Sequence, residues 1–181
     1  EDTLSYFNTI KDGFDKYPTN AFLLQSLINY YIFFEGGIED AIEYLDEAIK
    51  LNPDMAEYYY VKGSLYEIKE QEEEALKNFN KALEVEKNNA GALAGLGRYY
   101  FKKGDAAASR SVEIRDLKAS KVEMDKANDF YKQSVKYFEQ VKEINISDVD
   151  SLRLLRSLYY KLYRDENHPK YVELGKIINK E

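Results

Sequence analysis

The fold is decided by the stretch AIEYLDEAIKL at residues 41–51, because its pattern returns as ALKNFNKALEV at residues 75–85, 34 positions later. Side-chain size or shape is kept at the equivalent positions of these stretches and of the ones that follow them: Ala41 and Ala75, Leu45 and Phe79, Ala48 and Ala82, Ala56 and Ala90, Gly63 and Gly97, Tyr66 and Tyr100. Apolar residues in each stretch recur three and four positions apart, which predicts amphipathic helices. Turn-forming residues at 52–54 and 88–89 separate them. A repeat of this length predicts stacked pairs of antiparallel helices.

After Gly104 the interval lengthens to 59, so that Phe79 corresponds to Phe138 and Tyr100 to Tyr159. The excess is an insertion of 25 residues within about 105–133, a segment that has no Pro or Gly and is rich in Ala, Lys, Glu and Asp. This composition favours helix over linker. We therefore predict that the third pair is extended into a protruding helical hairpin with its tip near residues 118–120; a flexible loop is the alternative.

These residues resemble the tetratricopeptide repeat (TPR) family. That family places a Leu-Gly pair and a Tyr on the first helix of each pair, as in Leu96-Gly97 and Tyr100, and Ala, an aromatic residue and Ala on the second, as in Ala75, Phe79 and Ala82. The resemblance implies an all-α fold, an α-α superhelix (TPR solenoid) of antiparallel helix pairs with one elongated hairpin, as a single domain over residues 1–181. Its parts are the second helix of a truncated unit at 3–18, units at 22–55, 56–89 and 90–148, and a degenerate unit at 149–181.

Within the family, the chain is similar to certain small bacterial TPR proteins with an extended third hairpin. Gly63 and Gly97 are expected where paired helices cross closely, because a larger side chain would separate the backbones. Two positions depart from the pattern: Lys87 replaces the closing Pro, and Arg156 replaces the small residue of the last unit. We expect Arg156 to disturb the packing there and to mark an open end of the stack.

Composition excludes several classes of function. The 181 residues contain no Cys and one His, His168, which excludes thiol nucleophiles, disulfides, thiolate metal sites and a His–His metal pair. A weak metal site at His168 is conceivable, but a helix start is the favoured interpretation of this segment. Residues 1–90 carry a net charge of −11 and residues 91–181 one of +4, so the acidic half repels phosphate backbones and we expect no nucleic-acid partner. No apolar run reaches bilayer length, and no phosphate-binding, hydrolase or EF-hand motif is present. The sequence therefore predicts no membrane insertion, no cofactor, no metal, no catalytic residues and no enzyme activity.

The 17 tyrosines gather on the predicted first helices, as at Tyr58-Tyr59-Tyr60. First helices line the concave face of TPR arrays, and aromatic residues with Arg are typical of binding hot spots. By register we predict a peptide-binding groove lined by Leu27, Tyr30, Phe33, Tyr60, Ser64, Glu67, Arg98, Phe101, Arg153 and Tyr160, with Phe34, Lys102, Ser157 and Lys161 beside them. The alternative is that these rings only cover one another.

Some TPR domains hold a peptide's C-terminal carboxylate with a clamp of Lys, Asn and Arg on successive first helices. The corresponding positions here hold Ser26, Tyr30, Val61, Gly91 and Gly95, so that clamp is absent. The leading hypothesis is a non-enzymatic interaction module that binds a protein or peptide segment in the groove. The alternative is a structural or assembly component that self-associates or docks through the hairpin or an exposed end; both a monomer and a weak dimer remain open.

The first residue is Glu1 rather than Met. Removal of an export signal is one explanation and would place the protein in the periplasm or envelope. A trimmed start is the other and is compatible with the cytoplasm. Lack of cysteine fits an oxidising compartment without requiring one.

Overall fold

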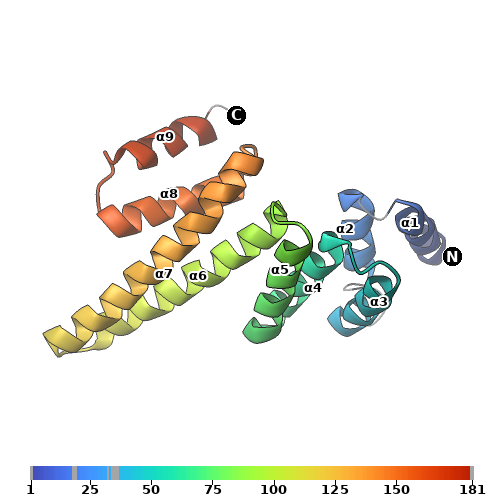
Figure 1. The fold of residues 1–181 in the computed structure, drawn as a ribbon, viewed down its shortest axis with the longest axis horizontal. Helices are drawn as coiled ribbons and strands as arrows, with labels where there is room; N and C mark the ends of the chain where they lie inside the picture. The colour runs from blue at the N-terminus through green and yellow to red at the C-terminus, as the bar shows by residue number, and fades with distance from the viewer. Residues whose placement is uncertain (1, 18–19, 32, 34–36, 180–181) are drawn as a thin grey trace. The chain divides into compact units, whose positions relative to one another are not determined.

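The computed structural model describes residues 2–17, 20–31, 33 and 37–179, and every regular element in these ranges is a helix. Its contacts divide the chain into two compact units, Glu1–Glu86 (unit 1) and Lys87–Glu181 (unit 2). In each unit, helices that follow one another in the sequence pack as antiparallel pairs (Figure 1). The all-α class and the helix pairing predicted from the sequence are confirmed.

Unit 1 contains α1 (Asp2–Lys16), α2 (Ala21–Tyr30), α3 (Ile38–Leu51), α4 (Ala56–Ile68) and α5 (Glu72–Val85). α1 packs on α2, α3 on α4, and α4 on α5. One cluster of buried side chains joins α1 to α4: Ile10, Phe14, Leu27, Ala41, Leu45, Ala48, Tyr58, Val61 and Leu65. The small and apolar positions of the repeated stretch in α3 are therefore the ones that this core buries.

Glycine on one helix and phenylalanine on the next set the spacing within two of the pairs. A Cβ at Gly63 in α4 would stand 2.7 Å from the Phe79 ring in α5. A Cβ at Gly97 would stand 2.8 Å from the Phe138 ring in the corresponding pair of unit 2. Both distances are shorter than a carbon–carbon contact allows. The close crossing expected at these two glycines is confirmed.

Unit 2 contains α6 (Ala90–Glu113), α7 (Leu117–Ile144), α8 (Val149–Tyr163) and α9 (Pro169–Ile178). α6 and α7 lie side by side as a long hairpin, α8 packs on α7, and α9 packs on α8 (Figure 1). The buried apolar side chains of this unit come from all four helices: Ala92, Leu93, Ala94, Leu96, Ala107, Ala127, Tyr131, Phe138, Val141, Leu152, Leu155, Leu158, Tyr159 and Leu174. The insertion is thus helical and continues α6 and α7.

The hairpin turns at residues 114–116, earlier in the chain than the predicted tip at 118–120, so that detail of the sequence prediction is wrong. Asp116 is the reason: its carboxylate accepts a hydrogen bond from the Ala119 N–H at 2.8 Å and caps the start of α7. One turn later, the Ser120 hydroxyl donates to the Ser111 carbonyl of α6 at 2.7 Å. These two bonds place residues 118–120 inside α7.

The last pair reverses the arrangement of large and small residues. Arg156 on α8 replaces the first-helix glycine of the earlier pairs, and Gly175 on α9 supplies the space instead. A Cβ at residue 175 would stand 3.3 Å from the Arg156 Nε. The guanidinium carbon lies 4.0 Å from the centre of the Tyr171 ring. The disturbance expected from Arg156 is therefore absorbed by a compensating glycine and by an aromatic face.

Candidate functional site

The α2 part of the predicted groove is wrong, because two of its residues are buried in unit 1. Leu27 is 1% exposed and belongs to the core, and Tyr30 is 4% exposed. The ring of Phe7 on α1 stacks on Tyr30 with 4.3 Å between ring centres. Register identified the apolar face of α2 but not the helix that covers it. Phe33 is 74% exposed, and Phe34 lies outside the described residues.

Tyr60, Ser64 and Glu67 follow one face of α4, and each is half-buried. The Ser64 hydroxyl donates to the Tyr60 carbonyl at 3.2 Å, so it bonds back to its own helix. The centre of the Tyr60 ring lies 6.4 Å from that of Phe79 on α5. These three side chains lie along one face of α4 and keep part of their surface accessible.

In unit 2, Arg98 and Phe101 are partly exposed on α6, three positions apart in the sequence. Phe101 is joined to two further helices. Its ring centre lies 6.3 Å from that of Tyr131 on α7, and the Lys161 Nζ of α8 lies 5.5 Å from its centre. The structure thus brings α6 and α8 together at Phe101 and Lys161, as expected for adjacent first helices.

A polar junction fixes this meeting of three helices. The Lys161 Nζ lies 2.9 Å from a carboxylate oxygen of Asp105, and the Tyr131 hydroxyl donates to the same carboxylate at 2.6 Å. Gly104 gives the Tyr131 ring its space. Burial of the ring raises the pKa of Tyr131, and the hydrogen bond to Asp105 raises it further, so the phenol remains a donor. Lys161 is therefore held over the ring of Phe101.

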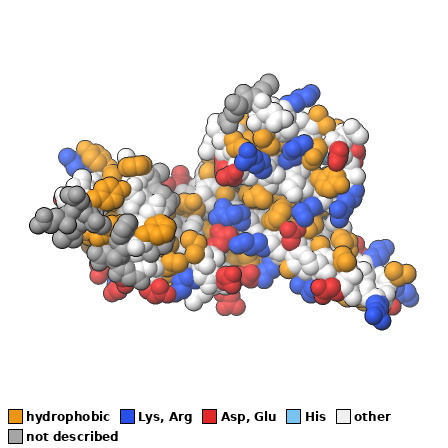
Figure 2. All heavy atoms as spheres, turned by 180° about the vertical axis from the view of Figure 1, so that it is seen from behind, with side chains coloured by type: hydrophobic (Ala, Val, Ile, Leu, Met, Phe, Trp, Pro, Cys, Tyr) orange, Lys and Arg blue, Asp and Glu red, His pale blue; other side chains and the backbone are white. Residues whose placement is uncertain are grey.

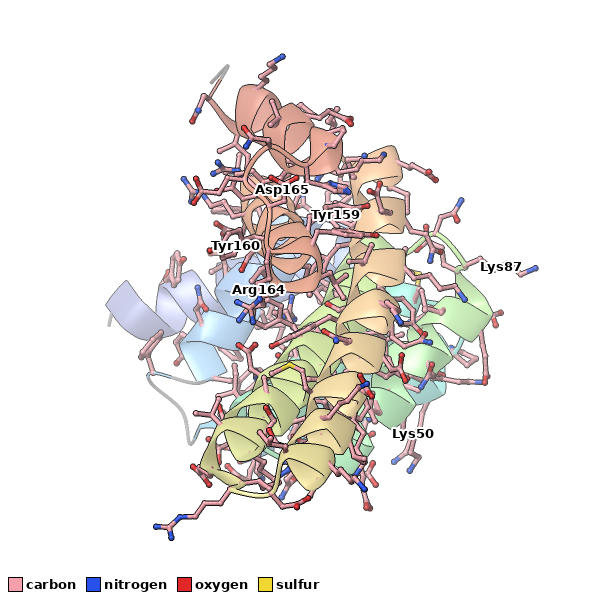
Figure 3. The ribbon with its side chains drawn as sticks, turned by 90° about the vertical axis from the view of Figure 1, so that its left-hand side faces the viewer. Lys50, Lys87, Tyr159, Tyr160, Arg164 and Asp165 are labelled. Atoms are coloured by element: carbon pink, nitrogen blue, oxygen red, sulfur yellow. The ribbon has the colours of Figure 1, made fainter. Side chains whose placement is uncertain are left out.

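A pocket lies between α8 and α9, with a volume of about 470 Å³. Its lining residues come from both helices: Arg153, Arg156, Ser157, Tyr160, Tyr171, Ile178 and Asn179. Two of them, Arg153 and Tyr160, are predicted groove residues. Figure 3 shows Tyr160 and Tyr159 on different sides of α8. Tyr159 turns toward α7, where its hydroxyl donates to Glu139 at 2.6 Å.

Arg156 and Tyr171 are pocket residues that the sequence did not identify as part of a site. In the sequence, Arg156 stands out only as a departure from the family pattern. Tyr171 lies in a helix whose repeat pattern is irregular, so register could not place it. The contact between the Arg156 guanidinium and the Tyr171 ring defines this part of the pocket. It forms only because α9 packs on α8, and the sequence does not show that packing.

Among the described residues, no group of three or more His, Cys, Asp and Glu side chains could hold a metal ion. A charged cluster joins α7, α8 and α9 around Glu139, which accepts a hydrogen bond from Tyr159 and lies 2.8 Å from the Lys142 Nζ. Burial raises the pKa of Glu139, but the hydrogen bonds from Lys142 and Tyr159 outweigh it and lower the pKa overall. This is the behaviour of a structural ion pair.

No described helix has the length and apolar character that a bilayer crossing requires. The end of the hairpin is the part of unit 2 where large apolar residues are most exposed, with Val112 at 82% and Leu117 at 86%. Figure 2 shows basic and hydrophobic side chains together at this end.

Comparison with known proteins agrees with this architecture. Residues 33–84 match the model of a tetratricopeptide repeat family. No curated protein matches the sequence. Among solved structures, MamA protein is similar with a TM-score of 0.53 and 19% identity, over 99% of this chain and 82% of that one. This likeness shows the fold.

Two further solved structures are similar over most of the chain. YrrB, described as a TPR protein with an unusual peptide-binding site, gives a TM-score of 0.41 at 20% identity, over 94% of this chain and 91% of that one. A tetratricopeptide repeat protein from Parabacteroides merdae gives 0.44 at 19% identity, over 99% and 72% of the two chains.

Proposed function

Because this chain is a tetratricopeptide repeat protein, a class that generally mediates protein–protein interaction, we propose that it is a non-enzymatic module that binds a peptide or protein segment along its first helices. The observation that supports this most strongly is the surface of unit 2 formed by Phe101, Arg153, Tyr160 and Lys161. It combines partly exposed rings with cationic groups on two first helices. Interface hot spots use the same residue types.

The partner segment that suits this surface has apolar anchors flanked by acidic groups. Phe101 offers an apolar face, and the Lys161 ammonium beside it remains partly exposed. Unit 1 carries a separate surface on α4, formed by Tyr60, Ser64 and Glu67, which is aromatic and acidic. The α2 residues take no part in the proposal, since the core of unit 1 buries them.

The test begins with the partner recovered with the protein from its native source and identified by mass spectrometry. Its affinity is then measured by isothermal titration calorimetry for the unmodified chain and for the double variant Phe101→Ala/Tyr160→Ala. We expect the double variant to bind at least about 10-fold more weakly, because each ring is a candidate hot spot. Tyr6→Ala, an exposed tyrosine of unit 1, is the matched control. Unchanged affinity in the double variant would contradict the proposal.

The end of the hairpin favours a second function, that of an assembly component. Exposed apolar residues at the end of a long helical pair are costly in water unless another surface covers them. Val112 and Leu117 stand on either side of the turn at residues 114–116. Docking of this end onto a second copy of the chain would bury both.

Sedimentation velocity over a range of concentrations tests this second function. If the hairpin end mediates self-association, the sedimentation coefficient rises with concentration, and Val112→Ser/Leu117→Ser abolishes the rise. Leu51→Ser removes an equally exposed leucine from unit 1 and serves as the control. A coefficient independent of concentration in the unmodified chain excludes self-association through the hairpin.

A further inference from the structure

One face of α8 carries four side chains that all lie in the wall of the α8–α9 pocket: Arg153, Arg156, Ser157 and Tyr160. Their spacing of three and four residues places them in one row along the helix. The opposite wall is formed by Tyr171 and Ile178 of α9 and by Asn179, which directly follows that helix. No carboxylate of the described residues lines this pocket. Two cations therefore face a cavity of about 470 Å³, large enough for a side chain of a partner.

Arg156 is held in place by packing and not by an ion pair. Its guanidinium carbon lies 4.0 Å from the centre of the Tyr171 ring, a cation–π distance that fixes the plane of the group. Its Nε is buried and has no hydrogen-bond partner among the described residues, and no ion pair to Arg156 is present there. A buried donor without an acceptor is unfavourable. The described residues that line the pocket supply no anion to this guanidinium.

Arg153 adds a second guanidinium that can be recruited. Its Nη1 lies 3.4 Å from Asp150, one turn earlier on α8, and both side chains are mostly exposed. An exposed pair of this kind contributes little and exchanges readily with solvent. Arg153 can therefore turn to a ligand in the pocket without a large loss of native interactions.

From this geometry we infer that the α8–α9 pocket binds the carboxylate of an acidic residue in the partner segment. The inference rests on the proposed function and names the chemistry that one subsite recognises. A planar guanidinium matches a carboxylate with two parallel hydrogen bonds, and the hydroxyls of Ser157 and Tyr160 can donate beside it. Tyr171 and Ile178 offer apolar surface to the methylene groups of a glutamate.

This subsite differs from the carboxylate clamp that some TPR domains have on successive first helices. Here both arginines belong to one helix, and the second helix of the pair, α9, completes the pocket. Gly175 is required for this arrangement, because a Cβ at residue 175 would lie only 3.3 Å from the Arg156 Nε. The site therefore depends on the reversed packing of this last pair.

The experiment titrates a blocked tripeptide, acetyl-Ala-Glu-Ala-amide, into the full chain labelled with ¹⁵N. The reporter is the Nε–H signal of Arg156, which its burial protects from exchange with water. We expect a saturable shift with this peptide and none with the neutral control acetyl-Ala-Gln-Ala-amide. Arg153→Gln should weaken binding roughly 10-fold, since a charge-assisted hydrogen bond is lost. Arg115→Gln, which removes an equal charge from the hairpin turn, should leave binding unchanged.

Three results would overturn the inference: equal shifts with the glutamate and glutamine peptides, an Arg153→Gln variant that binds as well as the unmodified chain, or a larger shift with inorganic phosphate at equal concentration. The last result would reassign the pocket to phosphate groups. The proposed function is tested separately with the identified partner. Loss of partner binding in Phe101→Ala but not in Arg153→Gln would retain the interaction module and remove the subsite. Loss in neither would remove both.

Discussion

Gly104→Ala should destabilise unit 2, although alanine is the better helix former. Gly104 lies within α6, where alanine would gain about 1 kcal/mol in helix propensity. A Cβ at this position would stand 2.5 Å from both Cδ1 and Cε1 of Tyr131 and 3.2 Å from its Cζ. The ring is buried, and its hydroxyl is bonded to Asp105 at 2.6 Å, so it cannot move away. Overpacking costs up to about 3 kcal/mol when neighbours cannot adjust, which leaves a net loss of about 2 kcal/mol.

A double-mutant cycle separates the steric clash from other effects of the substitution. Tyr131→Leu removes the ring edge that the new methyl group would strike. In that background Gly104→Ala should be neutral or stabilising by up to about 1 kcal/mol, so the coupling between the two sites is about 3 kcal/mol. Urea unfolding followed by circular dichroism gives the four free energies, with constant m-values as the check on the transition. An equal loss of stability in both backgrounds would refute the steric explanation.

Three shorter predictions concern other contacts of unit 2. The pKa of Glu139 is lowered in the folded state, so its contribution to stability is complete above about pH 4.5. That contribution is lost as the pH falls through the lower pKa of the folded state. In Glu139→Gln, the free energy of unfolding should therefore decrease less steeply as the pH is lowered. Asn89→Ala should cost about 1 kcal/mol in urea unfolding, because the Asn89 side chain accepts from the Ala92 N–H at 2.9 Å and caps α6. Arg156→Met should retain or raise the melting temperature while it abolishes binding of the glutamate tripeptide, since it removes a buried donor that has no partner.

The fold was predictable because it depends on local spacing. The interval of 34 residues reports which side chains face the core, and the structure buries Ala41, Leu45, Ala75 and Phe79 accordingly. The hairpin was predictable in kind from a segment without helix breakers. Its turn was not located correctly, because the cap formed by Asp116 depends on one hydrogen bond that composition does not reveal.

The candidate site was predictable only where one helix suffices to define it. Arg153, Ser157 and Tyr160 share a face of α8 by register, and all three line the pocket. Leu27 and Tyr30 share a face of α2 in the same way, yet α1 covers that face and buries both. Periodicity therefore finds the face of a helix but not its neighbour. The contribution of Tyr171 depends on such a neighbour, and only the structure places it.

The reversed packing of the last pair links its stability to its chemistry. In the earlier pairs a first-helix glycine accepts a phenylalanine from the second helix, and the contact is apolar and complete, as at Gly63 and Phe79. In the last pair the large side chain belongs to the first helix and ends in a charge. It packs against Tyr171 and Gly175, but its buried Nε–H has no acceptor among the described residues. An apolar residue at 156 would remove that deficit. The arginine instead leaves a positive group facing a pocket, which costs stability unless an anion occupies it. This deficit at a packing position is the reason that the proposed carboxylate subsite is placed at Arg156.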